Sequence, residues 1–498
     1  MNTLNRSNNF LAFLLVGLTF SGVSCQSGYR NSAANLVTLE RQGQYAGAAD
    51  LAAKDAQANL NDEADRVIFL LEAGRTAQLA GRVSASTAFY EQAYDIIRPY
   101  LDSKAEARVS EAIATTVVNQ TLAEYRGTPV ERIMLSTLQA LNRLQAGDFQ
   151  QARIELNRAR DWQQDAVEKA ANEIDRAEKE MSKKAKSKGI SSTSLKVPLQ
   201  LRAIQESMGD LTPYADWRNP FTSWLRAIFL MANASDPGDL GNARFDLREV
   251  ISMMPDFESV AGPDLAAIEQ ASIRPTTWVV FMSGLAPEYE EFRLDIPIPI
   301  GNVNYVAAAF PVLTPMTGSL SGLTVSVDDD HSDGALLANM DAMVAADFEK
   351  RLPVIVMQEI LSMALKTTAT WAASQAAGDS GGLVNLIGIV YQAATTAADL
   401  RSWRTIPKNI YAARIETPAS GKVTVRTPQE RLLGELRVVP DAFNLVVVSL
   451  PGSGPHEPST QSIRLDPGPR LDETTLPDSG NTSEIGALTD PNERSIPG

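Results

Sequence analysis

The stretch from Gly147 to Ala159 reads GDFQQARIELNRA and is the clearest copy of a phrase that recurs along the chain. A bulky residue, Phe149, stands two positions after the glycine, and a small residue, Ala152, stands three positions further on. Copies in the same order begin at Gly43, Gly81 and Gly238. Gly43 and Gly81 are 38 residues apart, and the next step to Gly147 is 66 residues. These steps are close to one and two periods of a helical repeat of about 34 residues.

This spacing predicts an array of paired helices over residues 34–260, a region rich in helix-forming residues at its start. The phrase resembles the tetratricopeptide repeat, in which glycine makes the turn and small residues let the helices pack closely. A plain helical bundle with glycine turns is the alternative. Because stacked repeats usually bind proteins or peptides, the bulky positions are candidates for contacting a partner: Tyr45, Tyr90, Phe149 and Leu156.

A charged segment near residues 161–190 is predicted to interrupt the array or to extend one of its helices. It ends in four lysines: Lys183, Lys184, Lys186 and Lys188. Opposite charges three or four residues apart favour a solvent-exposed helix. The lysines are either part of that solvated face or a contact for anionic lipid or cell-wall polymer.

Composition excludes several classes of chemistry. The chain has 498 residues and a formal charge of −15, with a single cysteine and two histidines. The acidic balance argues against a general nucleic-acid binder. One cysteine rules out an internal disulfide framework, and so few histidines argue against a histidine-based triad or metal site. We therefore expect no cofactor and no metal.

The N-terminus predicts export. Residues 1–24 contain one basic residue, Arg6, an apolar run and a small-residue exit, as in a secretory signal peptide. Val23-Ser24-Cys25 resembles the end of a bacterial lipobox, which makes Cys25 the candidate for lipidation and residues 25–33 a tether. In such lipoproteins Gln26 implies sorting to the outer membrane, facing the periplasm. An ordinary signal peptide, with Cys25 as an incidental thiol, is the alternative.

The second half changes to a strand pattern, and residues 275–450 are expected to form a smaller α+β domain. The predicted strands lie at 277–282, 291–300, 305–312, 323–327, 410–417, 422–426 and 443–450. Helices are expected from 335 to about 377, broken near Pro353, and from 383 to 400. Residues 451–498 are rich in Pro, Ser and Gly and are predicted to form a disordered tail.

The phrase from Asp399 to Pro407 clusters a carboxylate, an indole and two guanidinium groups. Arg401 and Arg404 could hold an anion, and an arginine could stack on Trp403, so a ligand pocket is one interpretation. The alternative is a structural corner, in which Asp399 pairs with an arginine and Trp403 fills the core.

Several phrases together resemble an uncharacterised family of bacterial tetratricopeptide-type envelope lipoproteins. They are the runs at 125–132, 140–142, 219–221, 283–287 and 399–407. None of them is a known catalytic signature. The resemblance implies a role in the cell envelope, because some members are encoded beside lipoprotein activators of peptidoglycan synthases.

The first expectation is therefore a membrane-anchored interaction protein without enzymatic activity, which binds protein partners of the envelope and no nucleic acid. A second hypothesis is a cell-wall polymer hydrolase using the carboxylates Glu288, Glu290 and Glu291 for acid–base chemistry. A third is a periplasmic module that binds sugar or lipid through Arg401, Trp403 and Arg404.

Overall fold

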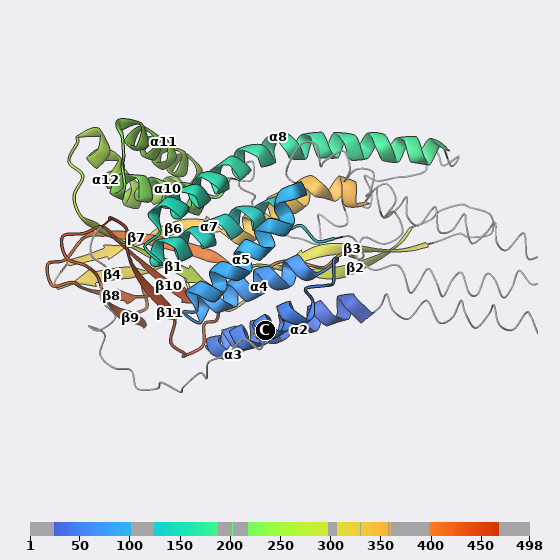
Figure 1. Ribbon diagram of the computed structural model, residues 1–498, viewed down its shortest axis with the longest axis horizontal. Coiled ribbons are helices and arrows are strands. Elements are labelled where there is room, and N and C mark those ends of the chain that lie inside the picture. Colours follow the sequence, from blue (N-terminus) through green and yellow to red (C-terminus); the bar gives the residue numbers. More distant parts are fainter. Residues whose placement is uncertain are drawn as a thin grey trace, which may run out of the picture. The chain divides into compact units, whose positions relative to one another are not determined.

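The computed structural model describes residues 24–100, 124–187, 202, 218–296, 306–328, 330–356, 359 and 398–467. Helices fill the N-terminal part and sheets the C-terminal part (Figure 1), which confirms a mixed fold with the helices first. Residues 1–23, the expected helix at 383–400 as far as residue 397, and the last residues from 468 lie outside this description. Residues 398–400 are described and are not helical. No helix in the described part is both long and apolar enough to cross a membrane.

The N-terminal helices form consecutive pairs. They are α2 (Ser24–Arg41) with α3 (Tyr45–Ala58), α4 (Arg66–Leu79) with α5 (Val83–Ile97), α7 (Pro129–Gln145) with α8 (Phe149–Ser187), and α10 (Pro220–Ala232) with α11 (Pro237–Met253). Short 3-10 turns, η1 (Arg98–Tyr100) and η4 (Pro255–Phe257), follow α5 and α11. A further helix, α12 (Glu258–Glu269), leads into the sheets.

Three pairs are joined by the same glycine turn. Gly43, Gly81 and Gly147 each have a φ of 73°, in the left-handed region that glycine adopts without steric cost. At Gly43, the Gly43 amide donates to the carbonyl of Glu40 and the Gln44 amide to that of Leu39. The same two bonds recur at Gly81 and Gly147. This is the Schellman arrangement, which satisfies the last carbonyls of the first helix and reverses the chain.

The phrase at Gly238 does not make this turn. Its glycine has no left-handed φ and lies in the first turn of α11, after the helix cap Asp236 and Pro237. Asp236 Oδ1 accepts the amides of Gly238 at 2.7 Å and Asp239 at 3.2 Å. The similarity of spacing was therefore misleading here, because an Asp-Pro helix start has replaced the glycine reversal.

Helix α2 corrects the prediction of a tether at 25–33, because the chain is helical there. Tyr29, Ala33 and Leu36 of this helix are buried in the core. The ring of Tyr29 meets Phe69 edge to face at 5.6 Å between centroids. An aromatic anchored four residues after Cys25 leaves no flexible spacer between that cysteine and the folded body.

The charged segment expected near 161–190 continues α8 up to Ser187, so it extends one helix of a pair. Among the described side chains, the buried apolar positions of α8 lie in its first part: Ala152, Leu156, Ala159 and Ala166. Helix α8 is longer than its paired helix α7 and extends past it, since α8 has 39 residues and α7 has 17.

A five-stranded sheet runs in the order β11-β10-β1-β7-β6. Its strands are β1 (Thr276–Ser283), β6 (Ala335–Asn339), β7 (Asn409–Glu416), β10 (Asn444–Leu450) and β11 (Ser459–Arg464). The central strand β1 pairs in parallel with β10 and antiparallel with β7. All eight residues of β1 are buried, as expected for a strand covered on both faces.

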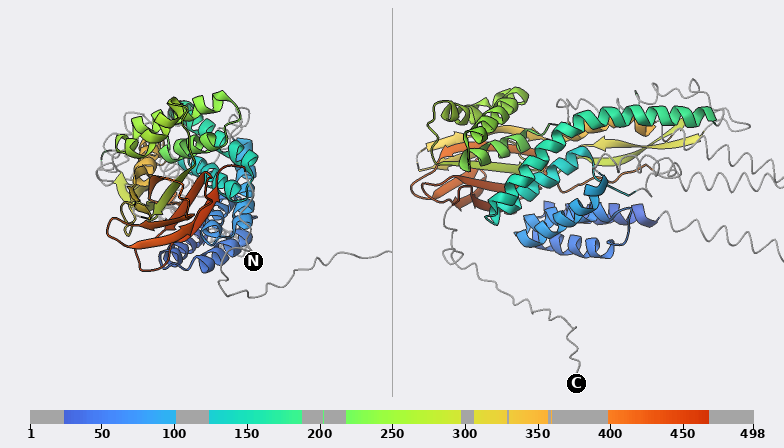
Figure 2. Two further views of the ribbon diagram at one scale, coloured as in Figure 1. Left: turned by 90° about the vertical axis from the view of Figure 1, so that its left-hand side faces the viewer. Right: turned by 45° about the horizontal axis from the view of Figure 1, so that its top comes forward.

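The side chains of β1 alternate between two cores. Trp278, Val280 and Met282 belong to the core shared with the N-terminal helices. Val279 and Phe281 face a second core, against the four-stranded sheet. The five-stranded sheet is thus a middle layer, with the helices on one side (Figures 1 and 2). Because the helices and this sheet share one apolar core, the chain up to Pro467 is one compact unit.

The second sheet has the order β5-β4-β8-β9, and a separate hairpin is formed by β2 and β3. The strands are β4 (Thr324–Val327), β5 (Asp330–Asp333), β8 (Lys422–Arg426) and β9 (Leu432–Arg437), with β2 (Glu288–Ile296) and β3 (Val306–Thr314) in the hairpin. The hairpin packs on the helix at 340–356 around Tyr289, Phe310 and Phe348.

Two predicted boundaries are wrong. The helix expected from 335 begins at 340 and continues through Pro353 to 356, because residues 335–339 pair with β7 as the edge strand β6. The tail expected from 451 is wrong for residues up to 467, because β11 pairs antiparallel with β10 and buries Ile463. Pro-rich composition hid a short edge strand in which alternate residues reach the core.

Candidate functional site

The 399–407 segment, which runs into β7, lies in the interior between the helices and the sheets. Arg401, Trp403 and Thr405 are 5%, 1% and 1% exposed. The indole ring of Trp403 meets Tyr90 edge to face at 5.8 Å between centroids, and its Nε1 donates to Thr405 Oγ1 at 3.1 Å. With its ring and its N–H both occupied by protein, Trp403 offers no face to a ligand.

Two buried glutamates from the helices, Glu72 of α4 and Glu131 of α7, hold the backbone of this segment; we call them the glutamate clasp. Glu72 Oε1 accepts the amide of Arg404 at 3.0 Å, and Glu72 Oε2 accepts the hydroxyl of Thr405 at 2.6 Å. Glu131 Oε1 accepts the amide of Trp403 at 2.7 Å. Both glutamates are nearly inaccessible to solvent.

Tyrosine hydroxyls complete the clasp. Tyr29 donates to Glu72 Oε1 at 2.9 Å and also lies against the carbonyl of Ser402. Tyr125 donates to Glu131 Oε2 at 2.5 Å. Burial raises the pKa of Glu72 and that of Glu131, and the hydrogen bonds that both carboxylates accept act in the opposite direction.

Glu131 serves two structures at once. Its Oε2 accepts the amide of Thr128 at 2.8 Å, while Thr128 Oγ1 accepts the amide of Glu131 at 3.3 Å, which makes a capping box at the start of α7. Its Oε1 is therefore left for Trp403. The same side chain begins a helix and fixes a segment from the sheet half of the chain.

Arg401 is surrounded by acceptors. Its Nε and Nη2 reach Asp399 at 2.9 and 2.7 Å, and its Nη1 reaches Asp65 at 3.0 Å and the carbonyl of Ala64 at 2.9 Å. The side chain of Arg404 pairs with Glu288 of β2. Both guanidinium groups are neutralised within the protein, so the geometry favours the structural corner over the anion pocket.

The carboxylates considered for hydrolysis do not form a pair. Glu290 is exposed, whereas Glu288 is held by Arg404. Glu291 Oε1 accepts from Arg293 at 2.7 Å, and its Oε2 accepts the amide of Ala398 at 3.3 Å. Neighbouring residues of a strand point to opposite faces, so Glu290 and Glu291 cannot converge on one bond. In the described part of the chain, no group of three or more His, Cys, Asp and Glu side chains could hold a metal ion.

The four candidates for partner binding divide into two groups. Tyr90 and Leu156 are 1% and 0% exposed and belong to the core, so neither is accessible in the folded chain. Phe149 and Tyr45 are half-buried at the starts of α8 and α3. The Tyr45 hydroxyl donates to the carbonyl of Glu457 at 3.2 Å. Bulky residues of the recurring phrase mainly pack pairs of helices together.

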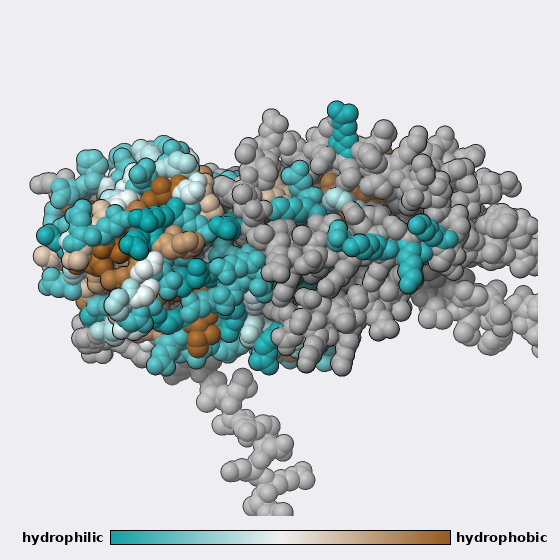
Figure 3. Space-filling view, turned by 90° about the horizontal axis from the view of Figure 1, so that it is seen from above, coloured by the Kyte–Doolittle hydropathy of each residue, from teal (hydrophilic) through white to brown (hydrophobic). Residues whose placement is uncertain are grey.

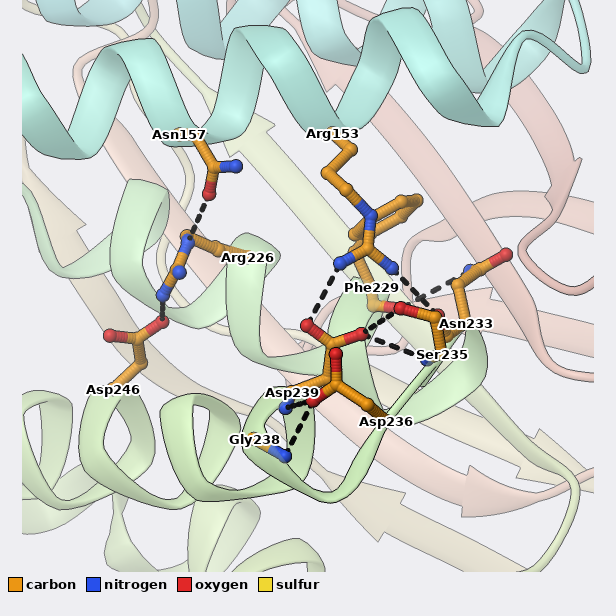
Figure 4. A network of polar contacts seen from close by, with 10 residues as sticks. All are labelled: Arg153, Asn157, Arg226, Phe229, Asn233, Ser235, Asp236, Gly238, Asp239 and Asp246. Atoms are coloured by element: carbon orange, nitrogen blue, oxygen red, sulfur yellow. Dashed lines mark hydrogen bonds and ion pairs between the residues drawn. The ribbon is translucent and has the colours of Figure 1, made fainter.

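A polar network fixes α8 on the last helix pair (Figure 4). Arg153 Nη1 donates to Asp239 Oδ1 at 2.9 Å, and its Nη2 donates to the carbonyl of Asn233 at 2.7 Å. Asp239 also accepts the amide and the hydroxyl of Ser235, both at 2.8 Å.

The second half of this network is one helical turn further along α8. Arg226 Nε of α10 donates to Asn157 Oδ1 at 3.0 Å, and the same guanidinium pairs with Asp246 of α11 (Figure 4). Since these arginines bond to protein acceptors on neighbouring helices, the network positions the helices rather than a ligand.

One buried acid stands apart from these satisfied groups. Glu40 of α2 is 0% exposed, and neither carboxylate oxygen has a hydrogen-bond partner among the described residues. Burial raises the pKa of Glu40 well above its usual range; Arg75 opposes this shift and Glu72 adds to it.

Glu72 and Glu131 were not predicted from the sequence, although each had a signal. Glu72 interrupts the apolar run Val67 to Leu71, which indicates a buried acid with partners. Thr128-Pro129-Val130-Glu131 has the spacing of a capping box. Neither signal identifies a partner more than 270 residues away.

Comparisons with known proteins give no match: no protein-family model, no curated protein and no solved structure is similar to this chain.

Proposed function

We propose that this chain is a lipid-anchored protein of the cell envelope whose helix pairs form a tetratricopeptide-like array and bind a protein partner. The helical array would provide the partner-binding surface, and the sheets would support the array through the glutamate clasp. The three identical glycine turns, at Gly43, Gly81 and Gly147, support a repeated unit. The different start of α11 makes the last pair an irregular unit.

Exposed apolar side chains on the helices are the main support for partner binding. Phe245 of α11 is 54% exposed and Ile154 of α8 is 46% exposed. Apolar groups interrupt a mostly hydrophilic face above the α10–α12 end of the molecule (Figure 3). Arg160 of α8 lies over the Phe245 ring at 5.7 Å from its centroid. Aromatic and arginine side chains are enriched where protein interfaces gain most of their affinity.

Cross-linking in the native envelope tests partner binding. We expect the full-length protein to capture a stoichiometric protein partner, and the double variant Phe245→Ser/Ile154→Ser to lose it. Leu432→Ser is the matched control, because Leu432 is 48% exposed but lies on β9, at the edge of the four-stranded sheet. Equal capture by both variants would remove the helix surface from the proposal, and capture of no partner by the unmodified protein would refute it.

Lipidation of Cys25 is tested separately. We expect mass spectrometry of the N-terminal peptide to find an acylated Cys25 and the protein to fractionate with the outer membrane. Cys25→Ser is expected to prevent processing at this site. An unmodified thiol in the mature protein would support an ordinary signal peptide instead.

A further inference from the structure

The C-terminal part of α8 presents a stripe of lysines. Lys179, Lys183 and Lys186 are all exposed, and their spacing of four and three residues places them within an arc of about 60° on one helix face. Lys179 pairs with Asp175 at 3.2 Å. Lys183 and Lys186 have no ion-pair partner in the part of the chain that the structure describes.

This stripe is a basic feature of an acidic protein. The chain has a formal charge of −15, yet residues 181–188 contain four lysines and no acidic residue. The stripe lies well past the buried start of α8, because Lys179 follows the buried Ala166 by roughly 20 Å along the helix axis. A helix extended past its partner, with its positive face exposed, can approach a flat anionic surface.

The position of the stripe indicates which surface. The C-terminal end of α8, the N-terminal end of α2 and the far ends of β2 and β3 lie toward the same end of the molecule (Figures 1 and 2). Cys25 lies in the first turn of α2, and the buried Tyr29 fixes that helix to the core. A chain attached to a membrane near the start of α2 therefore brings this end toward the lipid headgroups.

We propose that Lys179, Lys183 and Lys186 form a docking surface for the headgroups of anionic phospholipids. Each lysine near such a surface contributes attraction that falls off within the Debye length. The choice of a lipid surface rests on the membrane attachment at Cys25 proposed above, whereas the attraction of the lysines to anionic headgroups is measured independently of the acyl chain and of any protein partner. It would orient the body on the membrane and leave the exposed Ile154 of α8 and Phe245 of α11 free for a partner.

Vesicle partitioning tests this docking surface. The full-length protein purified from the envelope is mixed with vesicles of phosphatidylcholine alone or with added phosphatidylglycerol, and the ratio of the two partition coefficients is measured. An acyl chain inserts into both vesicles equally, so the ratio isolates the charge contribution whether or not Cys25 is lipidated. We expect a large ratio that approaches one when the ionic strength rises from about 0.1 M to about 1 M.

Replacing all three stripe lysines by Gln is expected to lower the ratio on the order of a hundredfold, about fivefold for each charge. The control replaces Lys54, Arg274 and Lys422 by Gln, which removes the same charge from exposed positions elsewhere. Circular dichroism verifies that both variants are folded. An unchanged ratio in the stripe variant, or an equal loss in the control, would overturn the proposal. So would binding to soluble polyglutamate that rivals binding to the anionic vesicles, since the stripe would then favour an acidic protein.

Discussion

The backbone amide of Trp403 donates a hydrogen bond of 2.7 Å to Glu131 Oε1, although the two residues are 272 positions apart in the chain. Glu72 makes the corresponding contact to the amide of Arg404. A helix carboxylate thus binds the main chain of a segment that enters the sheet, deep in the interior. Hydrogen bonds to a charged acceptor are stronger than neutral ones, and losing one partner leaves buried donors unpaired.

Glu131→Ala is expected to destabilise the fold by about 3 kcal/mol. The substitution leaves the amides of Trp403 and Thr128 and the hydroxyl of Tyr125 without their acceptor. Denaturant unfolding, followed by far-UV circular dichroism and by tryptophan fluorescence, measures the loss. Glu290→Ala is the control and should change the free energy of unfolding by less than about 0.5 kcal/mol, because Glu290 is exposed. Equal effects of the two variants would contradict the role of the clasp.

Trp403→Ala is expected to cost about 3–5 kcal/mol, since it opens a cavity beside Tyr90 in the shared core. The near-UV circular dichroism signal should change as the aromatic packing is lost. Trp403→Phe keeps most of the volume and should retain much of the stability. A fully stable Trp403→Ala protein would revive the interpretation of this residue as a ligand platform.

Glu40 predicts a pH dependence of stability. Its pKa is raised well above normal in the folded protein, so the unfolded chain loses this proton at a lower pH than the folded one. The contribution of Glu40 is therefore fully favourable below about pH 4.3 and is lost as the pH rises toward the folded pKa, at up to about 1.4 kcal/mol per pH unit. The charged or titratable groups that interact with it are Arg75, Glu72, Tyr45 and Tyr90.

Glu40→Gln should remove this dependence. Free energies of unfolding measured between about pH 4 and about pH 8 should show the variant gaining stability over the unmodified protein as the pH rises. Glu290→Gln, at an exposed site, should follow the unmodified protein. A constant difference between Glu40→Gln and the unmodified protein would show that Glu40 titrates normally.

Substitutions at the left-handed residue that ends a helix are expected to change stability in opposite directions at Gly81 and at Ala271. Gly81→Ala should destabilise by about 1 kcal/mol through its left-handed φ alone, because no atom lies within 4 Å of the added carbon. Ala271 has a φ of 51° after α12 and the same pair of backbone bonds as the glycine turns. Ala271→Gly should therefore stabilise by several tenths of a kcal/mol. Thermal unfolding of both variants measures the difference, and shifts in the same direction would contradict this account.

The sequence predicted the local structure well where a conformation requires one type of residue. The glycine phrase located three helix reversals, because a left-handed turn requires a residue without a Cβ. The run at 277–282 predicted β1, because a strand buried on both faces is apolar throughout. Gly238 stands in the same sequence pattern as the other glycines but lies in the first turn of a helix, so the same pattern can also occur at a helix start.

The candidate site was harder to predict, because exposure depends on what packs from elsewhere. Tyr90 and Leu156 are of residue types that also occur at binding surfaces, but both side chains are buried in the core. Phe245 belongs to no distinctive motif, and its exposure follows only from the way α11 packs on α10 and is hydrogen-bonded to α8. The tether at 25–33 failed for the same reason, since the burial of Tyr29 requires Phe69 and Glu72 of α4.

By itself, the sequence determined the mixed fold class, the helix turns and the core strand, because backbone sterics and apolar periodicity act over a few residues. Only the tertiary structure decided that helices and sheet share one core, that Trp403 is a core residue, and that Glu72 and Glu131 bind the 399–407 segment. These outcomes depend on contacts between residues hundreds of positions apart. A buried carboxylate must find donors wherever the fold supplies them, and no local pattern records where that is.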